Sequence, residues 1–104
     1  MISVVGLGNA ASRIAEKFLN TKNYNVFVLN SEVERKTKYK YKLKSFENPE
    51  EYEKNIPDLK KFFEPIDDEV QFFVVGSSFS SNYSLGILEQ LKDKKVNLFY
   101  IQHR

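Results

Sequence analysis

Continuous apolar runs recur along the chain, separated by segments with helical periodicity. Four runs rich in β-branched and aromatic residues lie at residues 2–7, 24–30, 70–76 and 96–102. Runs of this kind are typical of strands that are covered on both faces, as in a parallel sheet. The pattern therefore predicts a parallel sheet built on four buried strands.

The segments between these runs predict helices. Apolar residues recur three and four positions apart over residues 11–19, and Asn9 stands in place as an N-cap. Leu85, Leu88 and Leu91 form a second helical stripe. Residues 2–30 thus predict a βαβ unit, and its crossover is expected to be right-handed.

Two further helix starts are expected in the middle of the chain. Asn48 precedes Pro49, and Asn55 stands shortly before Pro57, an order of residues that favours the first turn of a helix. Because Pro57 cannot continue a helix without the loss of a backbone hydrogen bond, the pattern predicts two short helices rather than one long one.

Lysine alternates with apolar residues from residue 38 to residue 44. Side chains alternate across a strand, so Tyr39, Tyr41 and Leu43 fall on one face and the lysines on the other. This separation of rings from charges favours an edge strand protected by lysine over a strip that binds nucleic acid. Nucleic acid is therefore not an expected partner.

Taken together, these elements predict an α/β fold. We expect a three-layer α/β/α sandwich around a mostly parallel, Rossmann-like sheet of order 3-2-1-4-5, with a cleft above the carboxyl ends of strands one and four. The sequence stops at Arg104, soon after the last apolar run, and no further helix follows to cover that strand. Either the last strand lies half exposed, or the chain is a truncated form of the fold.

The composition is that of a single globular domain over residues 1–104. Hydrophobic residues make up 41% and charged residues 29% of the 104 residues, which excludes a disordered tail. No apolar run approaches the roughly 18 residues of a membrane-spanning helix, so a membrane is not an expected partner. Cysteine is absent and His103 is the single histidine, which excludes disulfides, thiolate chemistry and histidine metal clusters and suits a reducing cytosol.

The segment Gly6-Leu7-Gly8-Asn9-Ala10-Ala11 carries the clearest chemical signal. It follows a predicted strand and opens a predicted helix, which is the context in which a G-x-G-x-x-A pattern indicates phosphate binding. Glycine lets the backbone approach a phosphate closely, and the free N–H groups and dipole of a helix N-terminus favour negative charge. The sequence therefore predicts an anion site at this turn.

Two further segments lie at the same predicted edge of the sheet. The second strand ends in Asn30, Ser31 and Glu32, with Arg35 nearby, which suits either ribose hydroxyls or a 2′-phosphate. A loop of small residues at positions 76–84 follows the 70–76 strand. Two such loops side by side are expected to grip a nucleotide from both sides.

These segments resemble the N-terminal part of the GTPase domain of the tubulin/FtsZ family, and they are similar to tubulin-like proteins of large phages. The resemblance is carried by GLGNAASRI at residues 6–14, LNSE at residues 29–32 and the small-residue loop at residues 76–84. The family reads the guanine base and activates water through segments that come after the point where this chain ends. The resemblance therefore implies nucleotide binding without a complete hydrolytic cycle, and no catalytic residue in this chain.

The resemblance also implies a ligand, partners and a set of contacts. It implies GTP with Mg²⁺ bound to a cytoskeletal protein that self-associates into filaments, in the cytoplasm of a bacterium or of a phage-infected bacterial host. The implied contacts are Gly6, Gly8, Asn9 and Ala10 at the phosphates, Asn30 and Glu32 on the ribose side, and Gly76, Ser77, Ser80 and Ser81 at the terminal phosphates.

Two other functions fit the same residues. In an NAD(P)-binding Rossmann-type domain of an oxidoreductase, residues 6–11 would hold the pyrophosphate while Ser31 and Arg35 read the adenosine ribose. In a non-catalytic interaction domain, the fold would remain and the ligand would have been lost. A dinucleotide fold has no need of the second loop, whereas a tubulin-like site uses it.

Overall fold

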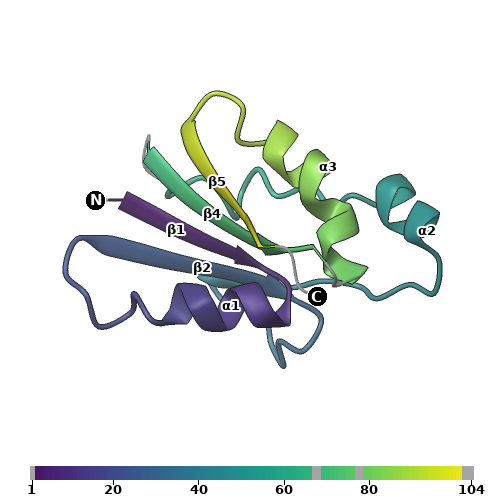
Figure 1. Ribbon diagram of the computed structural model, residues 1–104, viewed down its shortest axis with the longest axis horizontal. Coiled ribbons are helices and arrows are strands. Elements are labelled where there is room, and N and C mark those ends of the chain that lie inside the picture. The colour runs from purple at the N-terminus through teal and green to yellow at the C-terminus, as the bar shows by residue number, and fades with distance from the viewer. Residues whose placement is uncertain (1, 67–68, 77–78, 102–104) are drawn as a thin grey trace.

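Five parallel strands form one sheet, in the spatial order β3-β2-β1-β4-β5. The computed structural model describes residues 2–66, 69–76 and 79–101, except for the side chains of Phe79 and Ser80. The predicted Rossmann-like α/β fold and its strand order are confirmed (Figure 1). The strands are β1 (Ile2–Leu7), β2 (Tyr24–Asn30), β3 (Lys40–Lys42), β4 (Glu69–Val75) and β5 (Lys95–Ile101).

The register of the central strands brings their carboxyl ends to one edge of the sheet. Leu7, the last residue of β1, lies beside Leu29 of β2 and Val74 of β4. The loops that leave β1, β2 and β4 therefore start at neighbouring points. This edge is where ligands bind in open parallel sheets.

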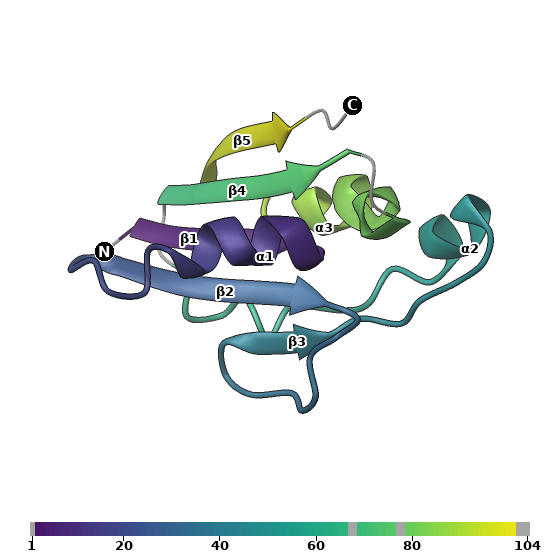
Figure 2. The ribbon, with the colours of Figure 1, turned by 60° about the horizontal axis from the view of Figure 1, so that its bottom comes forward.

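Helices cover the two faces of the sheet unequally. The helix α1 (Asn9–Glu16) packs on one face, against β1, β2 and β4, and Figure 2 shows it in front of the sheet. The helices α2 (Pro49–Lys54) and α3 (Ser84–Glu89) belong to the opposite side, with the segment that joins α2 to β4. Among the described residues, sixteen buried residues form the apolar core on that side, whereas four form the core between α1 and the sheet, one of them Ala15 of the helix itself.

A glycine lets α1 lie directly on the central strand. A Cβ atom at Gly6 would lie 2.7 Å from the carbonyl oxygen of Ala11 and 2.9 Å from the Cα of Ser12. Both of these atoms belong to the backbone of α1, so no side-chain movement can relieve the overlap. The first glycine of the motif is thus required by helix–strand packing, whatever else it does.

Two predictions about helix starts are wrong. Gly8, with φ 90° and ψ 168°, is the N-cap of α1, and Asn9 is instead the first helical residue and makes no capping hydrogen bond. The positive φ of Gly8 turns the chain sharply out of β1, which moves the start of the helix back by one residue. The helix expected from Asn55 and Pro57 does not form, and residues 60–65 make turns instead.

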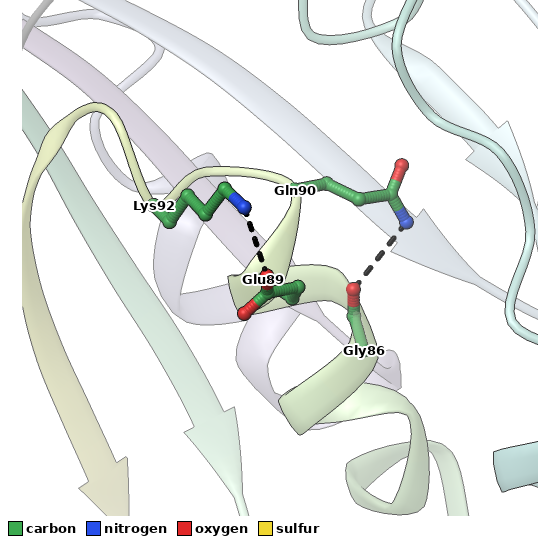
Figure 3. A network of polar contacts seen from close by, with 4 residues as sticks. All are labelled: Gly86, Glu89, Gln90 and Lys92. Carbon is green, nitrogen blue, oxygen red and sulfur yellow. Dashed lines mark hydrogen bonds and ion pairs between the residues drawn. The ribbon is translucent and has the colours of Figure 1, made fainter.

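The side chain of Gln90 contacts the backbone of the segment that follows Pro57. Its Oε1 accepts a hydrogen bond from the N–H of Leu59 (2.7 Å), and its Nε2 donates to the carbonyl of Pro57 (2.9 Å). Gln90 Nε2 also lies 3.4 Å from the carbonyl of Gly86 within α3, next to the exposed Glu89–Lys92 ion pair (Figure 3). The segment after Pro57 is therefore tied to α3 rather than to a helix of its own.

The leucine stripe of α3 is confirmed at Leu88 and Leu91, which pack against or within the larger core, and it is wrong at Leu85. Leu85 is 80% exposed, whereas Tyr83, Ile87 and Leu91 are buried in the larger core. These three residues stand four positions apart and lie on one face of the helical segment. The hydroxyl of Tyr83 donates to the carbonyl of Lys44 (2.8 Å), and its ring packs edge-on against Tyr52 at 4.8 Å between centroids.

The two edges of the sheet carry the features expected of them. The strand β3 is shorter than predicted, but its alternation is confirmed, because Leu43 is buried and Tyr41 packs against the larger core while Lys40 and Lys42 are exposed. The last strand, β5, lies largely exposed, an arrangement that fits both predicted alternatives.

The packing at Gly6 predicts a specific cost of adding one methyl group. We expect Gly6→Ala to lower the free energy of unfolding by about 1–3 kcal/mol, because α1 must move away from β1. Gly86→Ala is the matched control: the three atoms nearest to a Cβ there, at 2.5–2.9 Å, all belong to the side chain of Ile56, which can move where backbone cannot, and alanine favours the helix. Chemical denaturation measures the free energy of unfolding of both variants. An equal or greater loss of stability in Gly86→Ala would contradict the role of Gly6 in packing α1 against β1.

The buried Tyr83 predicts a loss of stability in alkali. Burial, with smaller contributions from Tyr52 and Tyr41, raises the pKa of Tyr83 from 10.0 to about 12. Because the folded state holds the proton more tightly, this stabilisation is complete below pH 10.0 and is lost as the pH rises toward about 12.

We expect the free energy of unfolding to fall by on the order of 2 kcal/mol across this range. Tyr83→Phe removes the titrating hydroxyl and should flatten that part of the profile. Tyr24→Phe retains Tyr83 and should keep the wild-type slope. Identical slopes in the wild type and in Tyr83→Phe, measured by denaturation at each pH, would show that another group causes the loss.

Candidate functional site

The start of α1 presents free backbone N–H groups at the carboxyl edge of the sheet. Gly8 is held there because its own N–H donates to the carbonyl of Leu29 (2.7 Å). Ser12 N–H donates to the carbonyl of Gly8 (2.9 Å), and the N–H groups of residues 9–11 precede this bond and have no acceptor within the helix. The positive end of the helix dipole lies at the same point.

Asn9 adds an unsatisfied polar atom to this helix start. Its side-chain oxygen Oδ1 is buried and has no hydrogen-bond partner among the residues that the structure describes. A buried polar atom without a partner costs about 1–3 kcal/mol. Asn9 also lines a cavity, so this residue lies at the boundary between the start of α1 and that cavity.

The cavity lies between α1 and the carboxyl end of β2 and has a volume of about 420 Å³. Its lining brings together both signs of charge, which suits a ligand with anionic and hydroxyl groups. The basic residues are Arg13, Arg35 and Lys40, and the acidic residues are Glu16, Glu32 and Glu34. The remaining lining residues are Asn9, Ser12, Val28, Asn30, Val33 and Thr37.

Asn30 lines this cavity and makes two hydrogen bonds that hold its neighbours in place. Its Nδ2 donates to Ser12 Oγ (3.2 Å), and its Oδ1 accepts from the N–H of Glu32 (3.0 Å). The first bond ties the end of β2 to α1, and the second shapes the turn that carries the exposed Glu32. Asn30 therefore acts as a positioning residue, while Glu32 presents its carboxylate to the cavity.

The structure brings together most of the residues predicted at the first turn and at the end of β2. Asn9, Asn30 and Glu32 line the cavity, Gly8 precedes it at the start of α1, and Ala10 is exposed in the first helical turn. Sequence analysis missed Ser12, Arg13 and Lys40. Ser12 was detectable, because it is a polar residue beside Ala11 and Ala15 on the buried side of the helix.

The second loop has a different local structure from the one expected. A Cβ at Gly76 would lie 2.7 Å from ring atoms of Tyr100, so the missing side chain makes room for that ring. Gly76 N–H donates to the carbonyl of Ile101 (2.8 Å), and the Ser81 hydroxyl donates to the carbonyl of Gly76 (3.3 Å). Ser77 and the side chain of Ser80 lie outside the described residues.

Comparison with known proteins leaves the family open. A scan of protein-family models gives no match to this chain, and a search of curated proteins gives no match either. Within residues 2–66, 69–76 and 79–101, no helix combines the length and the apolar character needed to cross a membrane. The fold and the cavity thus define a Rossmann-like α/β domain, and the tubulin/FtsZ relationship stays a prediction.

Proposed function

We propose that this domain binds a nucleotide at the carboxyl edge of its sheet, and that GTP is the ligand. One observation carries the proposal: the N–H groups of residues 9–11, which have no acceptor within α1, lie at the carboxyl edge of the sheet beside the cavity that Asn9 lines. A phosphate accepts hydrogen bonds from such N–H groups, and the helix dipole favours its charge. The choice of guanine rests on the resemblance to the tubulin/FtsZ family.

In this proposal each part of the site has a separate task. The N–H groups of residues 9–11 bind the phosphates, and Gly8 keeps the approach to them free of a side chain. Glu32 accepts hydrogen bonds from the ribose hydroxyls, and Asn30 holds the turn that carries Glu32. Mg²⁺ would neutralise the phosphate charge, and the exposed Glu16, Glu32 and Glu34 bring carboxylates to the same cavity.

NADPH is the second candidate, and it is favoured by the basic residues of the cavity. Arg13, Arg35 and Lys40 line the same space as Asn30, at the end of the second strand. A dinucleotide-binding fold places the 2′-phosphate of the adenosine ribose at this position and reads it with arginine. The packing of Tyr100 on Gly76 favours the same candidate, because it gives that glycine a role that needs no second phosphate loop.

Calorimetric titration with GTP, ATP and NADPH, each with Mg²⁺, separates these functions. The proposal expects saturable binding of GTP in preference to ATP and NADPH. Tighter binding of NADPH than of GTP would contradict the GTP proposal and support the second candidate, an NADPH-binding domain. No binding of any of the three would leave a non-catalytic interaction domain and overturn the proposal. Sedimentation of the GTP-loaded protein tests the filaments that the resemblance implies.

The variant Asn9→Asp tests the location of the phosphate. Its carboxylate has the shape of the amide but places a negative charge beside the phosphate, so we expect at least a tenfold loss of nucleotide affinity. The helix dipole favours this carboxylate, whereas the burial of one of its oxygens opposes it, so chemical denaturation of the free variant is measured beside the titration. A loss of affinity in a variant that stays folded reports the charge and not unfolding.

Asn20→Asp is the matched control for this substitution. It adds the same charge at an exposed position beyond the end of α1, outside the cavity lining. Nucleotide affinity should stay within about twofold of the wild type, because exposed charges more than a Debye length from the ligand are screened. Equal losses in the two variants would place the phosphate somewhere other than the start of α1.

A further inference from the structure

The two edges of the sheet differ sharply in charge. The edge at β3 is lysine-rich, with Lys38, Lys40, Lys42 and Lys44 exposed in and around that strand. The edge at β5 carries one charge, Lys95, at its first residue, and residues 96–101 are uncharged. Lysine on an edge strand opposes pairing with another strand, whereas an uncharged edge invites it. The two edges lie on opposite sides of the sheet (Figure 2).

Both faces of β5 expose large apolar side chains. Leu98 is 48% exposed and Tyr100 is 53% exposed, and they share the face on which Val96 packs against the larger core. Phe99 points to the opposite face, where its ring stacks on Phe73 at 4.8 Å and remains 43% exposed. An extra strand beside β5 would therefore bury apolar surface on both faces at once.

We infer that β5 is a self-association surface, on which two copies of this chain pair edge to edge through antiparallel β5 strands. The outer N–H and C=O groups of β5 have no strand partner among the described residues, and a second β5 would supply one for each. A two-fold axis perpendicular to the sheet generates this arrangement from identical surfaces. The result is a continuous sheet across the two copies.

The charge pattern of β5 favours an antiparallel pair of copies over a parallel one. The strand has seven residues from Lys95 to Ile101, so Leu98 is its middle residue. Full overlap places Leu98 opposite Leu98 of the second copy, and Val96 opposite Tyr100. The two Lys95 residues then lie at opposite ends, roughly 20 Å apart at about 3.3 Å per residue. A parallel pair would instead bring these two ammonium groups side by side.

The same features limit pairing through strand edges to two copies. Each copy uses the uncharged edge of the described sheet, and the lysines around β3 oppose further growth from the other edge. The contact consists of one strand per copy, with Leu98, Phe99, Tyr100 and Ile101 as its exposed apolar side chains. An interface of this size lies at the weak end for protein pairs, so its formation should depend on concentration.

Charge substitutions at Leu98 test the pairing and its register together. Analytical ultracentrifugation of the full chain, from about 1 µM to about 500 µM, should show a concentration-dependent shift to twice the monomer mass. Leu98→Lys and Leu98→Glu each place two like charges directly opposite one another, which is destabilising. Each variant alone is therefore expected to be monomeric, with at least a tenfold loss of self-affinity.

An equimolar mixture of the two variants restores opposite charges at the centre of the pair. We expect the mixture to regain the mass of two copies, a rescue that a merely unfolded or damaged strand does not give. Leu85→Lys is the matched control, because Leu85 is an equally apolar and 80% exposed leucine on α3, and it should pair like the wild type. A monomeric wild type up to the highest concentration, equal loss in Leu85→Lys, or failure of the mixture to pair would each overturn the inference.

Discussion

The contact between α1 and β1 at Gly6 is the constraint on which the site depends. Backbone lies against backbone there, so α1 has one position on the sheet and its first turn emerges at a fixed point. Gly8 then takes a positive φ that turns the chain from the strand into the helix within one residue. The free N–H groups of the helix are consequently held beside the ends of β2 and β4, mainly by backbone contacts.

The cavity exists because α1 is held at this position and because it is the one described helix on its face of the sheet. The helix α1 shields β1 and parts of its neighbours, while the opposite side carries α2, α3 and most of the buried core. Space therefore remains between α1 and the end of β2, where the hydrogen bond from Asn30 to Ser12 keeps helix and strand in register. The residues that the cavity exposes are charged, because a hydrophobic lining there would be open to water.

Local sequence patterns were sufficient to predict the strands and their order in the sheet. A strand covered on both faces needs an unbroken apolar run, and consecutive βα units place strands beside each other, so residues 2–7, 24–30 and 69–75 were found nearly to the residue. The missed features depend on partners distant in the sequence. The side chain of Gln90 accepts a hydrogen bond from the N–H of Leu59, and the ring of Tyr100 packs where Gly76 has no side chain. At the start of α1, the N-cap is Gly8, with its positive φ, and not Asn9.

The account therefore reduces to one claim, that the first N–H groups of α1 bind phosphate. Amide NMR during titration with inorganic pyrophosphate tests it directly, because each backbone N–H of the chain reports separately and no base or ribose is involved. The account predicts saturating shifts that are largest at the N–H groups of residues 8–11. Shifts confined to the lysines at residues 36–44, with residues 8–11 unchanged, would contradict it.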